Sequence, residues 1–223
     1  MVTQPEQVFL EIEGQRPVAD ALRALPDAVW SRCEVFSAAA GDVMARLGTT
    51  PQWLMVVIVG ELHLVRYLPN GAVAVLQRST GGFVAEASLD APRYHCHILA
   101  AAPSRVLRIP LALFRSEMVS NEVLRSVWIR RLTREVVRLR AQSERLRLKS
   151  AADRVAHYIE SEGTHARLVL SQTRKAWAAE LGLSHETLYR TLAEMERDGA
   201  LIATSDDDSF VLTLTTAGGA KLG

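Results

Sequence analysis

The chain has 223 residues, of which 48% are hydrophobic, enough for one large domain and a smaller one. Its 26 basic and 25 acidic residues nearly cancel, so the net charge of +1 does not indicate a nucleic-acid partner. Two cysteines are too few for a disulfide framework. The N-terminus has no basic region, and the longest strongly apolar run, Trp53–Val59, is far shorter than a membrane span. We expect a cytoplasmic protein with no membrane partner.

Positive charge is concentrated in one segment. Residues 121–150 contain nine basic and three acidic side chains, whereas the rest of the chain contains 17 basic and 22 acidic ones. The near-neutral total therefore hides a strongly basic segment.

Residues from about 33 to 110 alternate short aliphatic runs with turn residues. The separators include Gly60, Pro69-Asn70-Gly71 and Gly81-Gly82. Strands of this length and spacing predict an antiparallel sandwich or barrel, and Asn70-Gly71 predicts a hairpin. The predicted strands are Trp53–Val59, Leu62–Leu68, Ala72–Leu76, Cys96–Leu99 and Val106–Ile109.

The next segment predicts one long helix over residues 111 to about 150, because no Gly or Pro occurs between Pro110 and Gly163. Its apolar residues recur every seven positions in two series offset by three, which is the seam of a coiled coil. The seam predicts a homodimer. The alternative is a core stripe packed on the chain's own β domain, which the strongly charged flanks disfavour. The seam residues are Ile129, Leu132, Val136, Leu139, Ser143 and Leu146.

A helix-turn-helix is predicted near the C-terminus. The first helix covers Thr173–Leu181, and Gly182 permits the positive φ of a tight turn. Ser184 is suited to cap a second helix. In that helix three apolar residues share the inward face: Leu188, Leu192 and Met195.

The opposite face of the second helix carries the predicted base-contacting residues, which are His185, Glu186, Tyr189 and Arg190. Arg190 can donate two hydrogen bonds to guanine, and Glu186 can accept one from cytosine. An ordinary solvated face is the alternative. The predicted phosphate-contacting residues, which set register rather than specificity, are Thr173, Arg174, Ser184 and Thr187.

A β-hairpin, Leu201–Thr204 with Phe210–Leu214, follows Gly199 and is interpreted as a wing. Its acidic tip, Asp206-Asp207-Asp208, should repel phosphate. The predicted domains are a sensor at 1–110, a dimerisation helix at 111–150 and a winged helix-turn-helix at 151–223.

This layout resembles the Crp/Fnr superfamily of bacterial transcription regulators. The most specific stretch is Leu183-Ser-His-Glu-Thr-Leu-Tyr-Arg190, which is similar to the family's recognition helix. The resemblance implies an α+β fold: an N-terminal cyclic-nucleotide-binding-like antiparallel β-roll, a long dimerisation helix and a C-terminal winged helix-turn-helix. It implies a homodimer on a palindromic double-stranded DNA operator, with Glu186 and Arg190 reading a TGA-like core. RNA polymerase is an implied partner if the protein is an activator.

The resemblance also places an effector pocket in the roll, where this sequence departs from cyclic-AMP-binding members. Ala85-Glu86 keeps the family's glutamate and lacks its glycine, and Leu139-Arg140 stands at the adenine-contacting pair of the long helix. The family's second phosphate-holding pair corresponds in this sequence to either Arg93-Tyr94 or Tyr94-His95. Because of these departures, we expect a sensor domain that is not tuned to cyclic AMP. The sequence identifies no cofactor. The candidate pocket residues are Glu86, Arg93, Tyr94, His95, Leu139 and Arg140.

The cluster His95-Cys96-His97 contains haem and transition-metal ligands. On a strand, the two histidines would face one side and Cys96 the other, so all three cannot bind one metal without a bulge. The alternative, a buried structural Cys96, leads us to predict no metal site. Two cysteines also argue against an all-cysteine iron–sulfur cluster.

Two other classes compete with a DNA-binding regulator. A cupin-type metalloenzyme would use the His95-x-His97 spacing, but residues 98–103 lack the glutamate that such a site requires, and other catalytic motifs are absent. We therefore do not expect an enzyme. A ligand- or haem-binding sensor acting on a protein partner would leave Glu186 and Arg190 unexplained.

Overall fold

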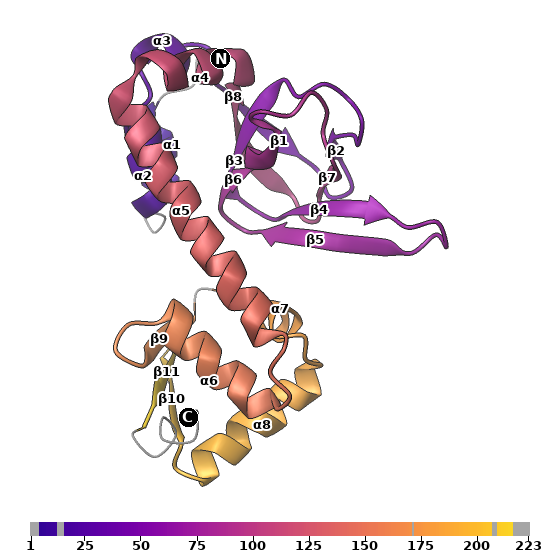
Figure 1. The fold of residues 1–223 in the computed structure, drawn as a ribbon, viewed down its shortest axis with the longest axis vertical. Helices are drawn as coiled ribbons and strands as arrows, with labels where there is room; N and C mark the ends of the chain where they lie inside the picture. The colour runs from indigo at the N-terminus through magenta and orange to yellow at the C-terminus, as the bar shows by residue number, and fades with distance from the viewer. Residues whose placement is uncertain (1–4, 13–15, 171, 207–208, 216–223) are drawn as a thin grey trace. The chain divides into compact units, whose positions relative to one another are not determined.

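The computed structural model describes residues 5–12, 16–170, 172–206 and 209–215 (Figure 1). The chain divides into two compact units, Met1–Arg131 and Leu132–Gly223. The boundary between the units falls inside a helix. The predicted domain boundaries at residues 110 and 150 were drawn between functional parts, not between compact units. They stay predictions.

The described part of the first unit forms two four-stranded antiparallel sheets, ordered β1-β8-β3-β6 and β2-β7-β4-β5 (Figure 1). The antiparallel roll is thereby confirmed, and the hairpin at Asn70-Gly71 joins β4 to β5. Strand β7 begins at His97 rather than at Cys96. The strands are β1 Glu34–Ala38, β2 Val43–Ala45, β3 Trp53–Val59, β4 Leu62–Tyr67, β5 Val73–Ser79, β6 Gly82–Val84, β7 His97–Ala100 and β8 Ser104–Pro110.

Strand β3 is buried on both faces, which explains its unbroken apolar run. Met55 and Val57 point into the interior of the roll. Leu54, Val56 and Ile58 point the other way, into a second cluster shared with helices. The outer face of this sheet therefore needs a helical cover.

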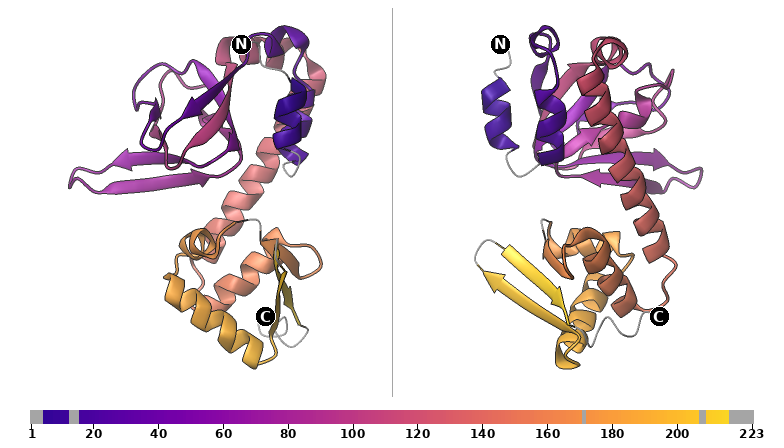
Figure 2. Two further views of the ribbon diagram at one scale, coloured as in Figure 1. Left: turned by 180° about the vertical axis from the view of Figure 1, so that it is seen from behind. Right: turned by 60° about the vertical axis from the view of Figure 1, so that its left-hand side comes forward.

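That cover comes partly from the N-terminal segment, which forms three helices that were not predicted (Figure 2). The helices α1 Pro5–Glu11, α2 Arg16–Arg23 and α3 Asp27–Trp30 are each eight residues or shorter, too short for a clear periodic pattern. Leu22 and Trp30 are buried in the same cluster as the outward residues of β3.

The predicted single helix over 111–150 was wrong, because it is two helices: α4 Leu111–Ser120 and α5 Glu122–Arg145. Asn121 between them is extended, and its side-chain oxygen accepts a hydrogen bond from the backbone N–H of Leu124 at 3.0 Å. An asparagine can therefore end one helix and cap the next without Gly or Pro. Arg125 then donates to the carbonyls of two residues in the last turn of α4.

The second unit has the winged helix-turn-helix order (Figure 2). Its described strands form one antiparallel sheet, β10-β11-β9, in which β9 was not predicted. The wing is a hairpin of β10 and β11, while Asp207 and Asp208 at its predicted tip lie outside the described residues. The elements are α6 Ala151–Glu162, β9 Arg167–Leu170, α7 Arg174–Glu180, α8 His185–Arg197, β10 Leu201–Asp206 and β11 Ser209–Leu214.

The core of this unit is built from the predicted inward faces. Leu188, Leu192 and Met195 of α8 are buried together with Trp177 of α7. Helix α8 is thus amphipathic, and its packing fixes which side chains remain outside. No helix among the described residues is long and apolar enough to cross a bilayer.

Candidate nucleic-acid interface

Two side-chain caps and one glycine define the helix-turn-helix. Thr173 accepts a hydrogen bond from the N–H of Ala176 at 3.2 Å, and α7 begins at the next residue. Ser184 accepts from the N–H of Thr187 at 3.1 Å and caps α8, as predicted. Gly182 in the turn has φ of +66°, a conformation that favours glycine. Local sequence therefore sets where α8 begins.

The four predicted base-contacting side chains lie on the solvent face of α8. His185, Glu186, Tyr189 and Arg190 are all exposed, whereas Leu188 between them is fully buried. An exposed N-terminal half of a helix, with an acceptor and a donor side by side, is the geometry that major-groove readout requires.

An aromatic cluster ties this face to the wing. The guanidinium of Arg174 lies over the ring of Phe210 in β11, 3.9 Å from its centroid. The same group donates to the Tyr189 hydroxyl at 3.3 Å, and the ring of His185 meets that of Tyr189 edge-on at 4.5 Å. Arg174 of α7 and His185 of α8 therefore restrain the side chain of Tyr189 on the surface of α8. No sequence pattern predicted the contribution from Phe210.

The predicted phosphate-contacting residues lie at the starts of α7 and α8. Thr173 and Ser184 are exposed, while Arg174 and Thr187 are half-buried. The hydroxyls of Ser184 and Thr187 lie 2.8 Å apart and are hydrogen-bonded to each other. Contact with phosphate remains a prediction for all four residues.

One arginine of the basic segment is buried, which the charge count did not anticipate. Arg145, in the last turn of α5, has no exposed side-chain area and donates to Ser161 at 2.9 Å and Glu162 at 3.2 Å. Its guanidinium also lies over the ring of Tyr158 at 4.3 Å. Burial and the nearby carboxylates of Glu180 and Glu162 raise the pKa of Tyr158. The end of α5 is thus anchored on α6.

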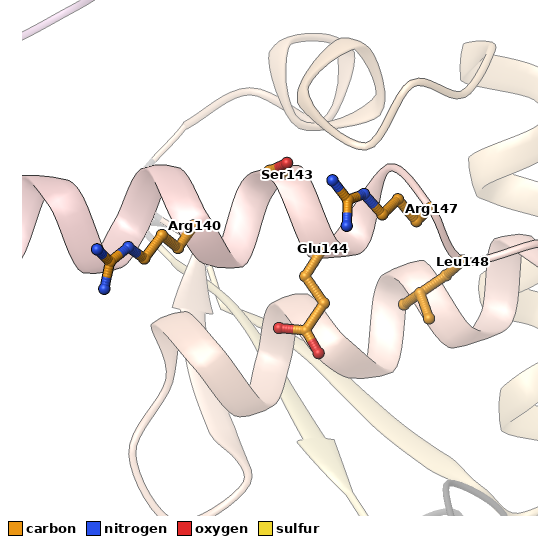
Figure 3. Close-up of a pocket in the computed structure, with 5 residues that line it drawn as sticks. All are labelled: Arg140, Ser143, Glu144, Arg147 and Leu148. Carbon is orange, nitrogen blue, oxygen red and sulfur yellow. The ribbon is translucent and has the colours of Figure 1, made fainter.

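The predicted seam residues are exposed along α5 and just beyond it. The apolar seam side chains are 36–54% exposed, and Ser143 is exposed as well. A shallow depression of about 540 Å³ lies beside the seam (Figure 3). Its lining comprises Arg140, Ser143, Glu144, Arg147 and Leu148. Exposure is what an interface with a second copy needs, and pairing remains a prediction.

In the roll, the predicted effector residue Glu86 is paired with an arginine of α5. The carboxylate of Glu86 accepts from Arg131 at 2.7 Å, and both side chains are largely buried. The Arg131 guanidinium lies over the ring of Phe83, 4.7 Å from its centroid. Ala85, where the resembling family has glycine, adopts φ of +74°. The backbone there keeps the left-handed conformation without the residue that favours it.

The other predicted pocket residues have separate partners or remain exposed, and their contact with an effector stays a prediction. Arg93 is exposed and donates to the carbonyl of Gly48 at 2.7 Å. The Tyr94 hydroxyl donates to the carbonyl of Trp53 at 3.2 Å, and burial raises the pKa of Tyr94. His95 is half-buried. Leu139 and Arg140 are exposed and belong to the second compact unit.

The histidine and cysteine cluster packs as part of the roll. Cys96 is 2% exposed in the interior cluster, and burial raises the pKa of its thiol. His97 accepts from the N–H of Leu47, and its ring meets Tyr67 edge-on. Among the described residues, no three His, Cys, Asp or Glu side chains are placed to hold a metal ion.

Residues 35–121 match the cyclic nucleotide-binding domain family. A solved structure from Silicibacter pomeroyi DSS-3, described as a candidate cAMP-binding regulatory protein, is 26% identical with a TM-score of 0.56. That alignment covers 89% of this chain and 93% of the other. The chain therefore shares the fold of a regulatory protein over nearly its whole length.

Two further structures share this fold at lower identity. FixK2 from Bradyrhizobium japonicum is 18% identical with a TM-score of 0.56, and the match covers 82% of this chain and 93% of that one. DNR from Pseudomonas aeruginosa is 19% identical with a TM-score of 0.52, and the match covers 100% of both chains. No curated protein sequence matches the chain. The layout inferred from the recognition-helix motif thus agrees with the fold of whole-length neighbours.

Proposed function

We propose that the chain is a homodimeric transcription regulator that binds a palindromic duplex by placing α8 of each copy in the major groove. The observation that carries the proposal is the exposure of His185, Glu186, Tyr189 and Arg190 on one side of a helix whose other side is buried. A helix held in this way presents base-reading groups and needs no rearrangement of its own core.

Within this proposal His185, Glu186, Tyr189 and Arg190 contact base edges, and Arg174 contacts phosphate. Arg190 donates to guanine and Glu186 accepts from cytosine. Tyr189 is restrained by Arg174, whose guanidinium is itself stacked on Phe210. The Tyr189 side chain therefore has little conformational freedom to lose on binding.

The deciding experiment compares Arg190→Ala with Arg197→Ala on the duplex selected by the unaltered protein from random sequences. Arg197 is an exposed arginine of the same helix that pairs with the neighbouring Asp198. Loss of base readout should weaken binding by about 5- to 150-fold in the Arg190 variant. The Arg197 variant should lose far less. Equal affinities for the two variants would overturn the assignment of α8.

The proposed dimer forms along the seam of α5. Leu132 and Leu139 should face their counterparts in the second copy, because the seven-residue repeat keeps both on one line. Replacing both with Asp should give monomers that no longer retain the duplex, as measured by light scattering and a binding titration. Val137→Asp is the matched control, since Val137 is 60% exposed and lies off the seam. Dimers of the doubly substituted protein would refute the interface.

We also propose that the sensor is not tuned to cyclic AMP. Arg131 already neutralises Glu86 at 2.7 Å, and Ala85 replaces the glycine of the resembling family. A bound cyclic phosphate needs a dense set of donors, and Arg93 is engaged elsewhere by the carbonyl of Gly48. Millimolar cyclic AMP should therefore leave the affinity for the selected duplex unchanged within about twofold. A saturable increase in affinity would contradict this part of the proposal.

A further inference from the structure

A single arginine of α6 joins three parts of the second unit. Arg154 donates from Nε to the carbonyl of Leu148, in the connection between α5 and α6, at 2.9 Å. Its Nη1 donates to the carbonyls of Leu181 and Gly182, in the turn between α7 and α8, at 3.2 Å each. One guanidinium therefore connects the segment after the proposed dimer helix to the turn that precedes the recognition helix.

The same turn packs directly against the end of the seam. A Cβ atom at Gly182 would lie 3.2 Å from the Cδ2 of Leu146 and 3.3 Å from the Nη1 of Arg154. Leu146 is the last apolar seam residue, and it follows α5 immediately. The turn, Leu146 and Arg154 thus form one packed junction within the second unit, which we call the turn junction.

We propose that Arg154 is a positioning residue that fixes α8 relative to the end of the dimer helix and thereby sets the half-site spacing of the operator. The inference rests on the proposed function, since it assumes a dimer on DNA. In a symmetric dimer the seam fixes the two α5 ends relative to each other. A restraint from that end to the turn then determines the separation of the two recognition helices.

The chemistry of arginine suits this role better than that of lysine. A guanidinium has several N–H donors in a rigid plane, so it can hold acceptors in fixed directions at once. Leu181 is the C-cap of α7, where backbone carbonyls lack partners within the helix and attract a cation. Arg154 therefore completes the hydrogen bonding of the turn as well as orienting it.

Spacing selectivity separates positioning from simple loss of stability. One inserted base pair moves a half-site by about 3.4 Å and rotates it by about 34°. A rigid dimer should lose roughly tenfold or more in affinity on such a duplex. A dimer with a loosened turn junction should distinguish the two spacings much less, whatever its absolute affinity.

The test measures binding of the unaltered protein, Arg154→Gln, Arg154→Lys and Arg197→Gln to the selected palindrome and to versions with one base pair added or removed at its centre. The expected result is a spacing preference of about tenfold in the unaltered protein and in Arg197→Gln. That preference should fall to within about threefold in Arg154→Gln, with an intermediate value in Arg154→Lys. Circular dichroism and light scattering establish that each variant is folded and dimeric.

An unchanged spacing ratio in Arg154→Gln would overturn the inference even if every affinity fell equally, because uniform loss is the signature of a stability effect alone. If Arg154→Gln does not fold, Arg154→Lys is judged by the same ratio. Failure of the proposed function looks different, since the unaltered protein would then select no duplex that depends on Arg190.

Discussion

The turn junction predicts a specific cost for adding one methyl group at Gly182. The φ of +66° is a left-handed conformation that costs an alanine about 1 kcal/mol or more. The new Cβ would also lie 3.2 Å from Leu146 and 3.3 Å from Arg154, closer than ordinary contact. Both neighbours belong to the junction, so neither can move without disturbing its hydrogen bonds or packing. Gly182→Ala should therefore lower the free energy of unfolding by more than the backbone cost alone.

Gly199→Ala isolates the backbone part of that cost. Gly199 has φ of +70°, almost the same as Gly182, but nothing lies within 4 Å of its added Cβ. Urea denaturation of both full-length variants should show a loss of about 1 kcal/mol for Gly199→Ala and a further 1 kcal/mol or so for Gly182→Ala. If Gly182→Ala is no less stable than Gly199→Ala, the contacts assigned to the turn are wrong.

Two further predictions concern the helix caps and the buried thiol. Ser184→Ala and Thr173→Ala should each lower the free energy of unfolding, measured by urea denaturation, by about 1 kcal/mol, because each removes the acceptor for an N-terminal N–H. Burial raises the pKa of the Cys33 thiol from 9.0 to about 12, so the folded protein keeps this proton at pH values where the unfolded chain loses it. The contribution of Cys33 to stability is therefore complete below pH 9 and declines towards pH 12, and Cys33→Ala should remove this part of the alkaline decline. An identical pH profile in both proteins would contradict the assigned burial.

The helix-turn-helix could be predicted from the sequence because the residues that define it act locally. Gly182, Ser184 and the inward trio of α8 lie within fourteen residues, and each acts on its own backbone or helix face. Such features survive in any tertiary context, so the cap, the turn and the buried face all followed from residue types. The resemblance then added the TGA-like core that Glu186 and Arg190 are expected to read.

The features that escaped prediction depend on distant partners. In the sequence, Asn121 looks like an ordinary polar residue of a helix. In the structure its side-chain oxygen caps α5, and its Nδ2 donates to the carbonyl of Ala24, 97 positions away. Arg145 and Arg154 were counted simply as charge. Their hydrogen bonds go to residues that only the folded unit brings near. Residue type therefore indicated the chemistry of these side chains but not the element on which each would act.

The arrangement of charge along α5 bears on the choice between a dimer seam and a core stripe. Arg131, Arg138 and Arg145 also recur every seven residues, on a line turned well away from the seam. Each one pairs with a carboxylate of its own chain: Arg131 with Glu86, Arg138 with Glu135 and Arg145 with Glu162.

Towards the start of α5, the line of arginines is continued by an apolar residue. Leu124 lies seven positions before Arg131 and is fully buried in the first unit. The face of α5 that carries Leu124 and the arginine line thus contacts other elements of its own chain, and of the seam residues Leu146 does so as well, at the turn junction. A core stripe would need the seam to make those contacts, and its apolar side chains are instead 36–54% exposed. The basic segment therefore favours a helix that uses arginines to hold its own chain and leucines to meet a second copy.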